Sequence, residues 1–200
     1  MMELVEDAKI FAQHIVVALD CLGEMEAMRN IFTSQEDKEQ YKEAPHFYFA
    51  AYHAMQYRVQ MIVANLFDNS GKSFDTFKNT VCKNTSLVDC SDYANKKKAA
   101  QQDINAIRTI RNKFLAHPDK TYFNCPETVY ANNPFSFQTI EKLLFSMLCL
   151  CNKIVFYYDK AVPAQLFSGY NRDDFIKLFG YKTEDDMHLE SWLQNGVTSP

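Results

Sequence analysis

Arg111 and His117 stand in the stretch Arg-Asn-Lys-Phe-Leu-Ala-His, and together they could cleave RNA without a metal ion. Histidine exchanges a proton near neutral pH, which suits proton transfer at a 2′-hydroxyl or at a leaving oxygen. The planar guanidinium of arginine pairs with phosphate oxygens and offsets the charge that builds on them. We therefore take Arg111, Asn112 and His117 as the candidate catalytic residues.

The segment around these residues is basic, although the chain as a whole is acidic. The 200 residues have a formal net charge of −4. Residues 96–120 alone carry a net charge of +5, from Lys96, Lys97, Lys98, Arg108, Arg111, Lys113 and Lys120 against Asp103 and Asp119. We assign Arg108, Lys113 and Lys120 to substrate binding. We interpret the three lysines at 96–98 as a solvated helix face, with steering of an RNA backbone as the alternative.

The spacing does not by itself bring the two groups together. Six residues at about 100° each leave Arg111 and His117 some 120° apart on a continuous α-helix. Pro118 disfavours helical geometry at His117, which would let that side chain swing toward Arg111. Alternatively, two copies of the helix end could meet across a two-fold axis, each supplying one cation and one imidazole.

The elements that must position these residues are all helices. Only five glycines and six prolines interrupt the chain, and apolar residues recur at three- and four-residue steps. This pattern predicts helices over residues 4–32, 45–68, 74–81, 92–116 and 140–158, with loops over 82–92 and 118–135. Ser73 is the predicted N-cap of the third helix. We expect an all-α, up-and-down helical bundle over residues 1–160. Residues 161–200 would add one or two short helices packed on the same domain.

Composition excludes several classes of protein. The acidic balance argues against a protein that coats nucleic acid over a wide face. No segment has the roughly 18 uninterrupted apolar residues of a membrane helix, and the acidic start is unlike a secretory signal. We therefore expect no membrane partner, a cytoplasmic location, and six reduced cysteines, several of which fill the core.

Other motifs have plainer interpretations. Gly71-Lys72-Ser73 resembles the end of a phosphate-binding loop, but Leu66 occupies the position of the glycine that this loop requires. His46 and His53 lie two helical turns apart, which is too far to hold one ion without other elements. Cys149 and Cys151 would point to nearly opposite sides of a helix. We therefore expect no metal and no cofactor.

The stretch with Arg111, Asn112 and His117 resembles the R-x(4–6)-H signature of the HEPN superfamily of small helical-bundle proteins. Arg-Asn-Lys-Phe-Leu-Ala-His-Pro-Asp looks most like the HEPN-like family associated with U-type abortive infection. Residues 45–48 (Pro-His-Phe-Tyr) and 64–68 (Ala-Asn-Leu-Phe-Asp) are similar to the second helix of that family. The resemblance covers residues 1–160.

This resemblance implies a metal-independent endoribonuclease of phage defence or of a toxin system. It also implies a homodimer with a composite cleft and RNA as substrate, and it makes an antitoxin a candidate protein partner whose existence the sequence leaves open. Asn112 would orient its neighbours or the phosphate. The competing hypothesis is a non-catalytic HEPN-like module that binds a nucleotide or a protein, because a fold does not prove chemistry.

Overall fold

The computed structural model describes residues 2–33, 45–68, 72–84, 88–116 and 126–159. Every regular element in these ranges is helical, which confirms the predicted all-α class. The elements are α1 (Met2–Thr33), α3 (Pro45–Leu66), α4 (Phe74–Asn84), α5 (Ser91–Ile110), the π-helix η1 (Arg111–Ala116), α7 (Pro126–Asn132) and α8 (Phe137–Asp159). None of these helices is long and apolar enough to cross a membrane.

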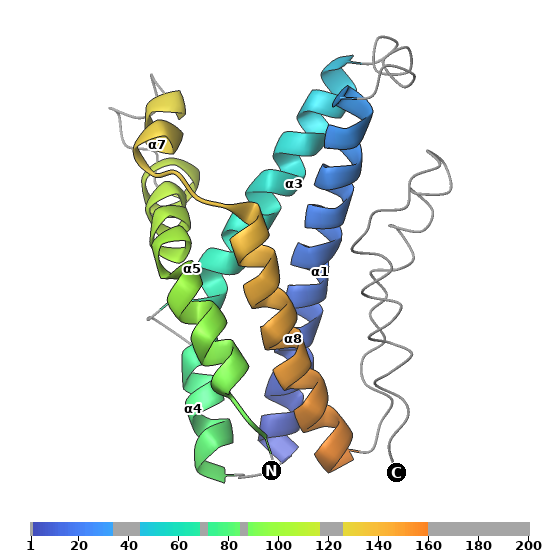
Figure 1. The fold of residues 1–200 in the computed structure, drawn as a ribbon, viewed down its shortest axis with the longest axis vertical. Helices are drawn as coiled ribbons and strands as arrows, with labels where there is room; N and C mark the ends of the chain where they lie inside the picture. The colour runs from blue at the N-terminus through green and yellow to red at the C-terminus, as the bar shows by residue number, and fades with distance from the viewer. Residues whose placement is uncertain (1, 34–44, 69–71, 85–87, 117–125, 160–200) are drawn as a thin grey trace.

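The long helices alternate in direction. Figure 1 shows α1 and α5 running one way and α3 and α8 running the other, with α4 continuing below the end of α3. Helix α8 packs against both α1 and α5, and α3 packs against α1 and α5. The result is the predicted up-and-down bundle.

The core follows the predicted stripes in α1 and α8. On α1 the buried positions recur every three or four residues, as do those of α8, which is the most apolar helix. Three isoleucines of α5 complete the centre, and each is at most 1% exposed. These buried side chains include Phe11, Ile15 and Leu22 of α1, Ile104, Ile107 and Ile110 of α5, and Leu144, Met147 and Ile154 of α8.

Two helix starts are capped as their sequences favour. The backbone N–H of Thr76 donates to Ser73 Oγ over 3.3 Å, which confirms Ser73 as the N-cap of α4. Ser136 caps α8 in the same way, through the N–H of Thr139 over 3.3 Å. The N–H of Ser136 in turn donates to Asp103 Oδ1 over 2.9 Å, so the start of α8 is tied to α5.

The structure corrects three predicted boundaries. Residues 118–135 are not all loop, because α7 begins at Pro126, a residue that suits the first turn of a helix. Residues 82–92 are not all loop either, since α4 continues to Asn84 and α5 begins at Ser91. The helix predicted to end near Ala116 changes from α to π at Arg111.

The N-terminal half of α3 is less buried than its apolar spacing predicts. Tyr48, Tyr52 and Met55 are only half-buried, whereas Val59 and Leu66 lie in the core. Figure 1 shows that this half of α3 extends past the start of α8, so that of the described helices it is α1 that runs beside most of it. The predicted tail helices over 161–200 lie outside the described residues.

Candidate functional site

The candidate site lies where α5 gives way to the π-helix η1. Arg111 still has α-helical backbone angles (φ −54°, ψ −50°), and its N–H donates to the carbonyl oxygens of Ile107 and Arg108. Residues 111–116 then adopt the wider i→i+5 pattern. Such π turns are rare and occur frequently at functional sites. The continuous α-helix assumed in calculating the 120° separation therefore does not extend through residues 111–116.

Arg111 forms an ion pair with Asp68, which follows the last residue of α3 by two positions. Its Nη2 lies 2.6 Å from Asp68 Oδ2, and the side chains are 18% and 29% exposed, respectively. Asp68 is itself held by its backbone N–H, which donates to the carbonyl of Asn65 over 3.2 Å. The pair therefore fastens the end of α3 to the end of α5, at the edge of the core.

One donor of the Arg111 guanidinium has no protein acceptor. The Nε atom is buried and has no hydrogen-bond partner among the described residues. A guanidinium has five N–H donors in a fixed plane, so one bond to Asp68 orients the group without using most of them. Asp68 thus holds Arg111 through Nη2, while the buried Nε is left without an acceptor among the described residues.

The other predicted site residues of this segment surround Arg111. Asn112 and Lys113 are exposed, and Arg108 is half-buried one turn earlier on the same helix. The carboxylate of Asp103 accepts the N–H of Ser136 and so ties the start of α8 to α5. The predicted catalytic base His117 and the predicted substrate-binding Lys120 lie outside the described residues.

Comparison with known proteins identifies the family. The family model HEPN_AbiU2, described as AbiU2, matches residues 11–178, which is most of the chain. This chain belongs to the HEPN_AbiU2 family. No curated protein and no solved structure matches it. Arg111 and Asn112, which carried the resemblance in the sequence, thus lie at the α-to-π transition of a HEPN-type helical bundle.

The lysines at the other end of α5 lie apart from Arg111 in this HEPN protein. Lys97 pairs with Asp75 over 2.7 Å, and Lys96 and Lys98 are exposed. A groove of about 560 Å³ between α4 and α5 is lined by Lys97, Lys98 and Asp75, among other residues. Thirteen residues of helix, about 20 Å, separate Lys98 from Arg111. Any contact of these lysines with RNA would therefore be remote from the candidate site.

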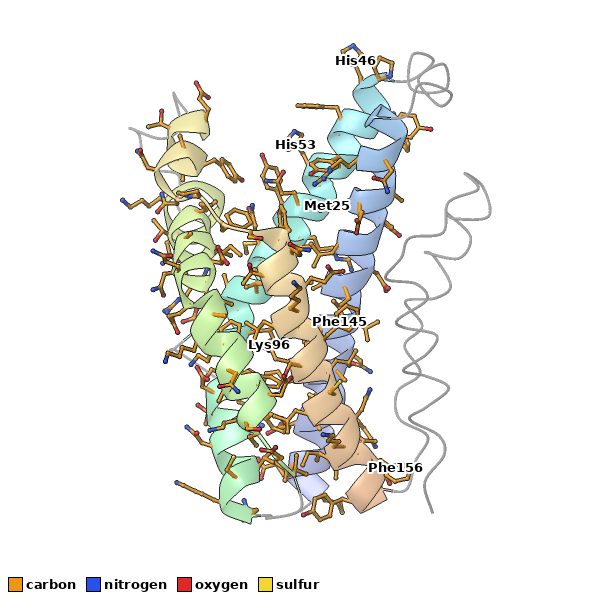
Figure 2. All side chains as sticks on the ribbon, in the orientation of Figure 1. Met25, His46, His53, Lys96, Phe145 and Phe156 are labelled. Atoms are coloured by element: carbon orange, nitrogen blue, oxygen red, sulfur yellow. The ribbon has the colours of Figure 1, made fainter. Side chains whose placement is uncertain are left out.

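The remaining motifs have structural roles in this HEPN protein. Lys72 pairs with Asp7 over 2.8 Å and Ser73 caps α4, so neither is in a phosphate-binding loop. His46 is exposed, and the ring of His53 lies 4.3 Å from that of Phe49 on the projecting half of α3 (Figure 2). No group of three or more His, Cys, Asp or Glu side chains that could hold a metal occurs in the ranges that the structure describes.

Sequence reasoning missed Asp68 as a site residue. Its only local signal was its place just after a predicted helix, and its partner is 43 residues away. It also missed α7, whose Tyr130 hydroxyl donates to the buried Gln60 of α3 over 3.2 Å. Burial raises the pKa of Tyr130 to about 12, so this hydroxyl stays protonated and can donate at neutral pH.

The Asp68 carboxylate should contribute measurably to stability. Replacing Asp68 with Asn leaves the largely buried Arg111 charge without its counter-ion. We expect the free energy of unfolding to fall by about 1–3 kcal/mol in urea denaturation. The matched control is Glu6→Gln, which removes an exposed pair with Lys9 and should change stability by less than about 0.5 kcal/mol. Equal stability of Asp68→Asn and wild type would show that the pair does not hold these helix ends.

Proposed function

We propose that this HEPN protein is a metal-independent endoribonuclease that acts as a homodimer. In the proposal, His117 is the general acid/base and Arg111 stabilises the charge on the phosphate. The observation that supports it most is the placement of Arg111 at the start of a π-helix, oriented by Asp68 and followed in sequence by His117. Membership of a HEPN family supports the same proposal.

The proposed reaction needs two proton transfers and one stabilised anion. A neutral His117 takes the proton from the 2′-hydroxyl, and that oxygen attacks the neighbouring phosphorus. Negative charge then grows on the non-bridging oxygens, where the guanidinium of Arg111 offsets it. A protonated imidazole gives its proton to the departing 5′-oxygen. The products carry a 2′,3′-cyclic phosphate and a 5′-hydroxyl.

Two copies of the chain supply the two imidazoles that this scheme uses. One His117 must be neutral and one protonated at the same moment, which a two-fold arrangement of helix ends provides. Of the two arrangements left open by the sequence, the homodimer with a composite cleft is therefore the one that we propose. We place the reaction in phage defence or in a toxin system, where an antitoxin protein would restrain it.

Asp68 acts in this scheme as a positioning residue. Its contact with Nη2 would hold the Arg111 guanidinium in one orientation before RNA binds. Other N–H groups of Arg111 could then bind the phosphate with little loss of side-chain entropy. Asn112 and Lys113, both exposed, would bind the RNA backbone beside it, together with Arg108 and Lys120. With Arg111, the cations Arg108, Lys113 and Lys120 would extend the basic character of the segment to the RNA strand.

Cleavage should depend on His117 and Arg111 and not on divalent metal. With excess EDTA, wild type should cut single-stranded or structured RNA to 2′,3′-cyclic phosphate ends. His117→Ala and Arg111→Ala should each lower the rate at least about 100-fold, as expected for a general acid/base or a transition-state cation. The measurement is gel analysis of end-labelled RNA with mapping of the termini.

The matched control for that experiment is His46→Ala, which removes an exposed histidine on α3. Its cleavage rate should equal that of wild type. Undiminished cleavage by His117→Ala would overturn the assigned catalytic role. Metal-dependent cleavage alone would overturn the mechanism.

A second candidate function, a non-catalytic binding module, is favoured by one feature of the site. The Arg111 side chain is only 18% exposed and already pairs with a carboxylate, so its charge is partly neutralised. The net charge of −4 favours the same alternative, because RNA enzymes usually carry more basic surface. In this case the helix end would recognise a nucleotide or a protein partner without reaction.

The dependence of RNA affinity on salt distinguishes the two functions. If the segment engages phosphates through several cations, log Kd should rise with log salt with a slope of about 0.7 per phosphate contact on single strands. We expect a slope of about 2–4 for wild type. For Lys113→Ala the slope should be lower by about 0.7, which corresponds to the loss of one phosphate contact. Fluorescence anisotropy titrations at salt concentrations between roughly 50 and 300 mM measure this slope. A slope near zero would favour the binding module for a protein partner.

A further inference from the structure

Two cysteines from different helices lie in contact at the junction of α4 and α5. Cys82 is in the last turn of α4 and is exposed, and Cys90 is the N-cap residue of α5 and is half-buried. The thiol of Cys82 donates to Cys90 Sγ, and the two sulfurs are 3.0 Å apart. Both thiols are free in this structure. This site has no part in the proposed ribonuclease reaction.

The backbone on the α5 side holds Cys90 in place. The Asp89 carboxylate accepts the N–H of Ser91 over 2.8 Å and its hydroxyl over 2.7 Å, and the N–H of Ala94 donates to the Cys90 carbonyl over 3.1 Å. The Cys90 side chain makes no capping bond to α5. Its sulfur instead contacts Cys82 and the Val88 carbonyl.

The α4 side is equally fixed. Phe77 and Val81, which precede Cys82, are at most 4% exposed and belong to the core. Phe77 also stacks on Phe11 of α1, with ring centroids 5.2 Å apart. Neither sulfur can therefore move far from the other without disturbing a packed helix.

We propose that Cys82 and Cys90 form a reversible intrachain disulfide, which makes this junction an oxidation site. With a small-molecule disulfide as oxidant, the Cys82 thiolate attacks one of its sulfurs and releases one thiol. Cys90 then attacks the mixed disulfide at Cys82 and releases the second thiol. In sum, two protein thiols are oxidised to one disulfide and the oxidant is reduced to two thiols.

The order of the two steps follows from the surroundings of each sulfur. Cys82 is exposed to an oxidant in solution, whereas burial and the neighbouring Cys82 raise the pKa of Cys90 to about 12. Cys82 therefore reacts first with the oxidant, and Cys90 then loses its thiol proton to solvent and attacks the mixed disulfide as the resolving group. The closed ring spans residues 82–90 and joins α4 to the helix that carries Arg111 at its other end.

Peptide mapping under non-reducing conditions tests the proposal directly. Trypsin cleaves after Lys78, Lys83 and Lys96, so Cys82 and Cys90 fall in separate peptides, 79–83 and 84–96. After oxidised glutathione treatment and blocking of free thiols, we expect these two peptides to appear linked, with two hydrogens fewer than their sum. Dithiothreitol should separate them. The full-length oxidised chain should also melt roughly 5 °C higher than the reduced chain, because the link constrains the unfolded state.

Matched serine variants complete the test. Cys82→Ser and Cys90→Ser should each lose the linked peptides and the rise in melting temperature, while Cys149→Ser, at another half-buried cysteine, should keep both. A variant that fails to fold leaves the wild-type mapping as the deciding result. The proposal is overturned if Cys82 of wild type is found free, capped by glutathione, or linked to a second chain. Loss of RNA cleavage would not affect this outcome.

Discussion

The ion pair between Arg111 and Asp68 is the interaction on which the candidate site depends. It joins two helix ends, those of α3 and α5, that the rest of the bundle brings to the same edge of the core. A largely buried guanidinium is unfavourable unless a carboxylate faces it, so the fold must bring Asp68 to this position. Ile107 and Ile110 are fully buried, so they hold the last turn of α5 in the core. They thereby fix the backbone position from which the Arg111 side chain extends.

The change from α- to π-helix begins at the same residue. The wider turn starts at Arg111 and continues to Ala116, so the polar residues Asn112 and Lys113 lie in the widened part. The ion pair and the change of helix type therefore fall at the same residue, Arg111. This combination of a rigid anchor with an adjacent irregular turn is typical of sites that must present charged groups in a fixed geometry.

Local patterns predicted most of the fold, since they depend on residues close together in sequence. The apolar stripes of α1 and α8 and the Ser73 cap are of this kind, because spacing and a single side chain determine them. The half-buried start of α3 could not be predicted from its apolar spacing, because the same spacing occurs whether or not a partner helix reaches that far. Helix α7 was missed because its seven residues are too few for a period to be recognised.

The site was only partly predictable, because local patterns involve only residues that are close together in sequence. The composition of residues 96–120 pointed to Arg111 and Asn112, but no local pattern could reveal Asp68, which becomes a neighbour only through the packing of α3 on α5. The π-helix was equally hidden, since it reflects the geometry at a helix end and not a residue preference. Family membership adds the HEPN type, and the charge, burial and pairing of Arg111 define the chemistry that this type would use here.

The account is tested most directly by a crystal structure of the assembled protein with an RNA that carries a 2′-deoxy nucleotide at the cleavage position. The account predicts two subunits whose helix ends form one cleft. In that cleft the scissile phosphate should lie within hydrogen-bond distance of Arg111, with Asp68 still on Nη2 and a His117 imidazole beside the reacting oxygens. A complex in which the RNA lies elsewhere, or in which Arg111 remains closed off behind Asp68, would contradict it.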